Sequence, residues 1–145
     1  MLLDRGTLPL VEMAFMNEVH KEDVELINTL FEALLVYERE PNEDYASKVD
    51  TAFETWVAHT ISHFEGEEIK MREMGFPPYA MHKGEHDRTL SHMRMLMEHW
   101  KQTREVKPLK IYLIEELPMW LTNHILTMDT VTAKFFKTSI SPCSI

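Results

Sequence analysis

The chain is poor in cysteine and glycine, with one cysteine and four glycines among 145 residues. The lone Cys143 cannot form an internal disulfide, which excludes a disulfide-stapled scaffold and agrees with a reducing compartment. So little glycine argues against a fold built from strands and tight turns. The 44% hydrophobic and 27% charged residues are typical of a globular protein. The length therefore predicts one helical domain, residues 1–145.

The chain also lacks an excess of positive charge and any long apolar run. Its 24 acidic and 15 basic residues give a net charge of -9, which would repel nucleic acid and anionic lipid. Asp4, Arg5, Pro9 and Glu12 interrupt the apolar N-terminus before a signal-peptide core could form. No other stretch approaches the roughly eighteen unbroken apolar residues of a membrane span. We expect a soluble cytoplasmic protein with no nucleic-acid or membrane partner.

Apolar residues recur at three- and four-residue steps in four segments, which predicts four helices at 17–40, 43–74, 80–104 and 109–137. A lead-in, 1–16, precedes them and a tail, 138–145, follows. Pro41 ends the first segment, and Gly75 with the two prolines after it ends the second. Pro118 lies inside the fourth segment and predicts a kink or a restarted helix there. Four amphipathic helices with short loops favour an all-α, antiparallel up-down-up-down bundle.

Polar residues that bind metals lie within the apolar stripes of these helices, where hydrophobic patterning alone would not place them. In the second segment, His63 and Glu67 are four residues apart, so both side chains project from one face. In the third segment, His82 and His86 have the same spacing. Either pair could chelate a metal ion.

The first and fourth segments add three more donors. His20 lies on the first segment, and His124 and Asp129 lie five residues apart on the fourth. In an α-helix a five-residue step rotates the second side chain by about 140°, which suits a wide, binuclear site. Five imidazoles and two carboxylates are too many for one tetrahedral zinc and too rich in nitrogen for calcium or magnesium. The set favours two transition-metal ions. Iron is the favoured metal, but zinc, manganese and cobalt also accept imidazole and carboxylate donors.

The order and spacing of these donors resemble those of the hemerythrin family, and the resemblance covers the chain from about residue 10 to residue 137. The stretch Trp120-Leu-Thr-Asn-His124-Ile125 resembles the family's last-helix motif, and His63-Phe64 followed by acidic residues resembles its second-helix motif. All seven ligand positions of the family pattern are filled: His20, His63, Glu67, His82, His86, His124 and Asp129.

The resemblance implies a non-haem di-iron protein that reversibly binds dioxygen for storage, delivery or sensing. Glu67, Asp129 and an oxo or hydroxo group would bridge two irons, and dioxygen would bind on the side of His20 and His63. Leu121 and Trp120 would form part of an apolar oxygen pocket. The remaining ligands on this reading would hold the other iron: His82, His86 and His124.

Other interpretations remain open from the sequence. An enzyme acting on peroxide or nitric oxide could use the same centre, whereas a ferritin-like oxidase needs Glu-x-x-His motifs that the chain lacks. An iron-storage or regulatory module is a third possibility. His59, one turn before His63, could be a group behind the ligands or an eighth ligand, but an ordinary histidine, buried or partly exposed, is favoured. His92 and His99 fall off the inner face of their helix and are predicted to face solvent.

Overall fold

The computed structural model describes residues 2–3 and 14–139, and side chains from Met16 to Phe136 within the longer range. Most of the predicted lead-in, most of the tail and Cys143 lie outside the described residues. Regular structure within the described range is helical. The first three helices are α1 (Ala14–Arg39), α2 (Glu43–Glu73) and α3 (Tyr79–Thr103).

A fourth rod, residues 106–139, is helical throughout but changes its hydrogen-bonding register twice. Two π-helical turns, η2 and η3, separate three α-helical pieces. In chain order the rod consists of α4 (Val106–Ile111), η2 (Tyr112–Glu116), α5 (Leu117–His124), η3 (Ile125–Asp129) and α6 (Thr130–Ser139).

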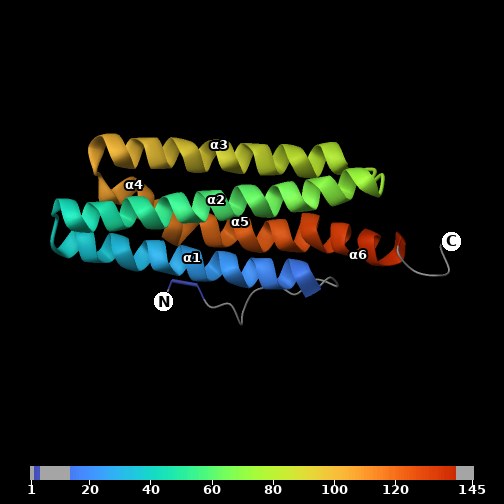
Figure 1. Cartoon of the computed structure of the whole chain (residues 1–145), viewed down its shortest axis with the longest axis horizontal. Coiled ribbons are helices and arrows are strands. Elements are labelled where there is room, and N and C mark those ends of the chain that lie inside the picture. The colour runs from blue at the N-terminus through green and yellow to red at the C-terminus, as the bar shows by residue number, and fades with distance from the viewer. Residues whose placement is uncertain (1, 4–13, 140–145) are drawn as a thin grey trace.

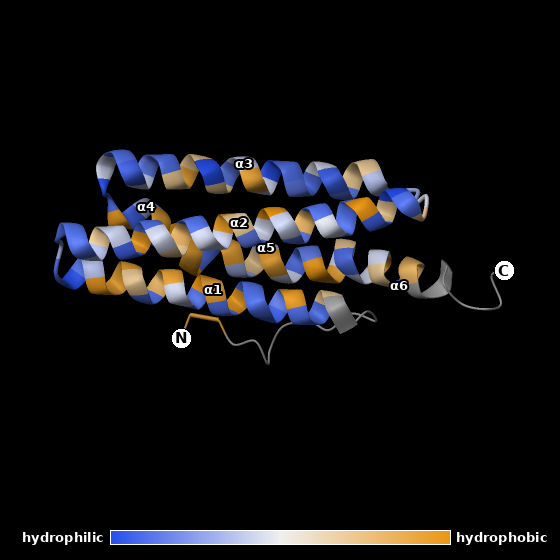
Figure 2. Cartoon of the chain, in the orientation of Figure 1, coloured by the Kyte–Doolittle hydropathy of each residue, from blue (hydrophilic) through white to orange (hydrophobic). Residues whose placement is uncertain are grey.

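The four rods lie lengthwise beside one another and run antiparallel in turn (Figure 1). Helix α1 packs against α2 and α2 against α3, while α4 contacts both α1 and α3 and so closes the bundle. Apolar and polar residues alternate along each rod in Figure 2, as expected when each helix turns one stripe inward. This arrangement confirms the predicted four-helix bundle.

Local residues fix where the helices begin and end. The Asn42 side chain accepts a 2.8 Å hydrogen bond from the Tyr45 N–H and caps the start of α2. Gly75, with φ of 65°, takes the left-handed conformation that ends the second rod, and the Phe76 N–H then bonds to the Met71 carbonyl at 2.9 Å. Short connections of this kind keep successive helices antiparallel.

Pro118 explains the first π-helical turn. Proline has no N–H and its ring crowds the preceding turn, so it is tolerated in the first turn of a helix but not in the interior. Helix α5 restarts at Leu117 with the proline in its first turn, and the Leu117 N–H bonds to the Tyr112 carbonyl five residues back. The predicted restart is therefore made by a register change rather than by a break in the rod.

Two apolar clusters fill the interior. The Trp100 cluster contains buried side chains from the half of the bundle that includes α4 and η2: Ile27, Leu30, Leu34, Ala46, Val49, Phe53, Trp56, Val57, Met93, Trp100, Leu109, Tyr112, Leu113 and Leu117. The Phe136 cluster lies toward the other end: Met16, Val24, Met71, Phe76, Leu121, Ile125, Ala133 and Phe136.

Buried polar side chains accompany the Phe136 cluster, and histidines and carboxylates dominate them. His20 lies between Met16 and Val24 on α1, and Glu67 precedes Met71 by one turn on α2. Within the described ranges, no helix carries a stretch both long and apolar enough to span a membrane.

Candidate metal centre

The seven predicted donors all point into the bundle interior. Each helical rod supplies at least one of them, and none of their side chains is more than about 6% exposed. They come from α1 (His20), α2 (His63 and Glu67), α3 (His82 and His86), α5 (His124) and η3 (Asp129).

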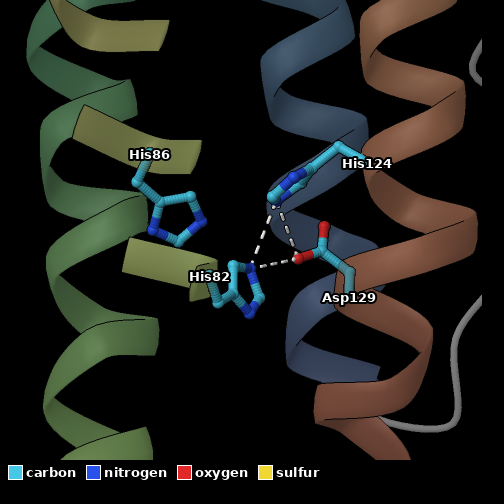
Figure 3. A group of neighbouring side chains, drawn as sticks. All are labelled: His82, His86, His124 and Asp129. Carbon is cyan, nitrogen blue, oxygen red and sulfur yellow. Dashed lines mark hydrogen bonds and ion pairs between the residues drawn. The ribbon is translucent and has the colours of Figure 1, made fainter. Parts of the chain in front are cut away.

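Three histidines and one carboxylate form the tightest group (Figure 3). The Nε2 atoms of His82 and His124 are 3.3 Å apart, and each lies 3.1 Å from Asp129 Oδ1. His86 completes the group, in which the four candidate ligand atoms lie within 4.8 Å of one another. All four residues are buried, so the group faces the interior rather than solvent.

The remaining donors adjoin this group through the two carboxylates. Asp129 Oδ2 is 2.9 Å from His20 Nε2, so the two oxygens of Asp129 face different histidines. Glu67 Oε1 lies 2.9 Å from His63 Nε2 and 4.0 Å from His86 Nε2. Each carboxylate therefore lies between the three-histidine side and the His20/His63 side, which is the placement a bridging ligand needs.

The predicted 140° offset between His124 and Asp129 is wrong, because the residues between them are not α-helical. The Thr130 N–H bonds to the Ile125 carbonyl five residues back, and the Thr130 hydroxyl donates to the same carbonyl at 2.7 Å. With i to i+5 bonding, a five-residue step returns close to the same side of the helix. The π-helical turn η3 thus brings Asp129 onto the face of His124.

In two histidines of α3, the ring nitrogen that faces away from the centre forms a hydrogen bond with a neighbouring side chain. His82 Nδ1 lies 2.8 Å from the Thr132 hydroxyl, and His86 Nδ1 lies 2.9 Å from Glu68 Oε2. A neutral imidazole that donates its Nδ1–H outward leaves the lone pair of Nε2 facing inward. Such partners fix the ring orientation of metal-binding histidines.

Asp23 plays the corresponding part for His63, at 2.9 Å from its Nδ1. The helical patterns alone did not indicate these outer partners, although one signal was present in the sequence. Asp23 follows His20 by three residues and therefore lies on the same face of α1. Helical spacing could have marked Asp23, but only the packing of α1 on α2 shows which histidine it meets.

The electrostatics favour a neutral His86 and a bound cation between the carboxylates. Burial, together with the neighbouring His82 and His124, lowers the pKa of His86 to about 2, so this ring is neutral, as a ligand must be. Burial alone would raise the pKa of Asp129, but hydrogen bonding from the surrounding histidines holds it well below its usual range. Burial and the nearby Asp129 carboxylate raise the pKa of Glu67. A cation between the two carboxylates would relieve their repulsion.

Several inward-facing polar atoms at the centre are buried without a hydrogen bond from any described residue. Such atoms are costly unless something else binds them. A metal ion would supply the missing partner for both nitrogen and oxygen donors, so the residues fit a metal centre. The atoms are His63 Nε2, both carboxylate oxygens of Glu67, His86 Nε2 and Asp129 Oδ1.

Trp120 and Leu121 lie beside His124. The Trp120 ring stacks on the His124 imidazole, with 4.7 Å between centroids and 12° between planes, and its Nε1–H donates to Glu85 at 3.1 Å. Leu121 is buried. Both residues line a cavity of about 20 Å³, whose wall also includes Phe64 and Leu117. This volume admits about one water-sized molecule.

The three remaining histidines and Gly66 lie outside the set of seven donors. His59 is 22% exposed and its Nε2 is 3.1 Å from Asp23 Oδ1. His92 and His99 are about half exposed, which confirms their solvent-facing prediction. Gly66 is exposed, and a Cβ added there would meet open space. Its lack of a side chain therefore makes no room at the centre.

Comparison with known proteins gives a consistent match. The profile of the hemerythrin HHE cation binding domain matches residues 12–135. A bacteriohemerythrin of Aquifex aeolicus is 31% identical over 134 residues, 92% of this chain and 97% of the relative. One from Methylococcus capsulatus is 24% identical over 81% of this chain and 82% of that protein. The crystal structure of wild-type hemerythrin shares the fold, with a TM-score of 0.71 at 19% identity, covering 94% of this chain and 97% of the other.

Proposed function

Because the chain belongs to the hemerythrin family, we propose that it holds two iron ions in this centre and binds dioxygen reversibly, for storage, delivery or sensing. The observation that carries the proposal is the placement of each carboxylate between two sets of histidines. Glu67 and Asp129, with an oxo or hydroxo group, bridge the irons. The terminal ligands are His82, His86 and His124 on one iron and His20 and His63 on the other.

The donor numbers make the two iron positions unequal. With the bridges shared, three imidazoles complete one coordination sphere and two imidazoles leave the other a ligand short. The open position belongs to the His20/His63 side, where a small molecule can bind. Two ferrous ions held by these residues would supply the redox chemistry of reversible oxygen binding. The protein's own contribution is to hold neutral Nε2 donors and two buried carboxylates at fixed positions.

A small cavity adjoins the centre between His124 and Asp23, the hydrogen-bond partner of His63. Its volume of about 20 Å³ excludes organic substrates, and Phe64, Leu117 and Leu121 give it a largely apolar wall. Trp120, stacked on His124, covers the centre on this side. An apolar wall keeps water and other proton donors from a bound oxygen molecule, which favours release of the ligand unchanged.

Oxygen binding is tested with iron-loaded protein reduced under nitrogen and then exposed to air. We expect two irons per chain and a visible charge-transfer band that appears with air and disappears on deoxygenation. His20→Ala should abolish the band and lose one iron, whereas the matched exposed-histidine variant His92→Ala should retain both. A wild-type protein that oxidises directly, with no reversible band, would overturn the proposal.

One observation favours a second candidate, an enzyme that consumes peroxide or nitric oxide. Asp23 lies on the wall of the same cavity, so the pocket is not wholly apolar. A carboxylate there offers a polar contact to a bound molecule. Rapid steady-state consumption of peroxide or nitric oxide by the iron-loaded wild-type protein, kept in His92→Ala and accompanied by no reversible oxygen band, would favour the enzyme over the carrier.

A further inference from the structure

Asp23 joins two histidines of α2 across the interface with α1. Its side chain is about 8% exposed, and its Oδ2 accepts the hydrogen bond from His63 Nδ1 at 2.9 Å. Its other oxygen, Oδ1, lies 3.1 Å from His59 Nε2. His59, one turn before His63, also approaches Glu22 Oε2 at 3.8 Å. The three side chains form a line from the partly exposed His59 to the buried His63.

The two oxygens of Asp23 face one histidine each. His63 Nδ1 is within hydrogen-bond distance of Oδ2, and His59 Nε2 lies at ion-pair distance from Oδ1. A buried carboxylate is costly unless it is paired and hydrogen-bonded. His59 is therefore the partner beside the oxygen of Asp23 that His63 leaves free.

We propose that Asp23, held by His59, is a positioning residue that orients His63 with Nε2 toward the metal and strengthens it as a donor. The proposal rests on the metal centre of the proposed function. A carboxylate behind a ligating histidine fixes its tautomer and raises its basicity as a ligand. Asp23 would thus act on the His20/His63 side, where the open position lies.

The outer contacts of the other ligands make this effect specific to one side. His82 is backed by the neutral Thr132 hydroxyl, and Glu68 backs His86 on the three-histidine side. Within the described part of the chain, His20 Nδ1 has no hydrogen-bond partner. Asp23 is therefore the hydrogen-bonded carboxylate behind the two-histidine side, and Glu68 offers a matched carboxylate behind the other.

The test measures metal binding without oxygen. Metal-free full-length protein is titrated with Co²⁺ under nitrogen, following heat and the visible absorption bands of cobalt. Wild-type protein should bind two ions. Asp23→Asn keeps the shape of the side chain and removes its charge. It should lower the affinity for one ion by roughly 10- to 100-fold and change the absorption bands of that ion, while the affinity for the other ion stays the same. Glu68→Gln should affect the other ion instead.

A further variant separates positioning from folding. His59→Gln retains a donor toward Asp23 and should weaken the same ion less than Asp23→Asn does. If Asp23 served only the fold, Asp23→Asn would lower the melting temperature of the metal-free protein and weaken both ions together. Either that result or an unaltered affinity for both ions would overturn the role of Asp23 while leaving the proposed metal centre in place. Fewer than two cobalt ions in wild-type protein would overturn the proposed centre and this role with it.

Discussion

The two halves of the bundle satisfy the polar groups beside their cores differently. In the half with the Trp100 cluster, polar groups pair with one another: the Trp100 indole donates to Asp50 at 2.8 Å, and Arg104 donates to the same carboxylate at 3.0 Å. In the half with the candidate centre, several buried nitrogens and oxygens have no hydrogen-bond partner among the described residues. The first half pairs its polar groups within the protein, and the second leaves donor atoms that a bound ion would satisfy.

This difference separates folding from function along one set of helices. Apolar burial in the Trp100 cluster supplies stability that does not depend on a ligand. Buried imidazoles and carboxylates in the other half reduce the stability of the metal-free protein, because desolvated polar groups are costly when unpaired. The contrast predicts which changes should act with metal present, without metal, or in both conditions.

The largest effect is expected from Phe53→Ala in the Trp100 cluster. Phe53 is fully buried, and truncating a core phenylalanine costs roughly 3–5 kcal/mol through lost burial and the cavity left behind. The free energy of unfolding, measured by denaturant titration, should fall equally with and without metal. Thr55→Ala, an exposed position on the same helix, is the control. A loss seen only in the metal-bound protein would contradict the separation of the two halves.

Metal removal should have the next largest effect and should act on the other half. An ion present at one hundred times its dissociation constant stabilises the folded state by about 2.7 kcal/mol. On metal addition, amide exchange governed by local opening should slow around Glu67 and in residues 124–132. The exchange rates of amides near Trp100 that exchange through local opening should change little. Equal slowing of local opening in both regions would show that the halves are not separable.

Asp50→Asn should have a smaller effect, about 1 kcal/mol, because the pair it disrupts is partly exposed. Burial alone would raise the pKa of Asp50, but Arg104 and Trp100 lower it below its ordinary value. Its stabilising contribution is therefore complete above about pH 4 and is lost as the pH falls through the folded-state pKa. The stability difference between wild type and Asp50→Asn should shrink accordingly. A difference that does not shrink between pH 5 and pH 2 would refute this account.

The smallest effect is expected at Gly66, which lies between the proposed ligands His63 and Glu67 on the exposed side of α2. Because a Cβ there meets open space, Gly66→Ala should raise the free energy of unfolding by up to about 1 kcal/mol. The gain should be seen as a higher melting temperature. Metal stoichiometry should stay the same. Gly75→Ala is the contrasting variant, since its φ of 65° strains an alanine and should lower stability.

Much of the fold and the identity of the inward donors could be predicted from the sequence. Apolar residues at helical spacing indicated four amphipathic segments, and polar residues within those stripes had to face the interior as well. His63 with Glu67, and His82 with His86, follow from spacing because α-helical geometry fixes which residues share a face.

The structure decided features that depend on other helices or on a departure from the α-helical period. The π-helical turn between His124 and Asp129 could not be read from spacing, because spacing arguments assume one fixed period. The partner of each outer ring nitrogen depends on how neighbouring helices are rotated and shifted against each other. Asp23 meets His63 and His59 for that reason alone. The sequence determined which groups turn inward, and the tertiary packing determined which of them meet, because contacts between helices depend on positions that no single helix's periodicity contains.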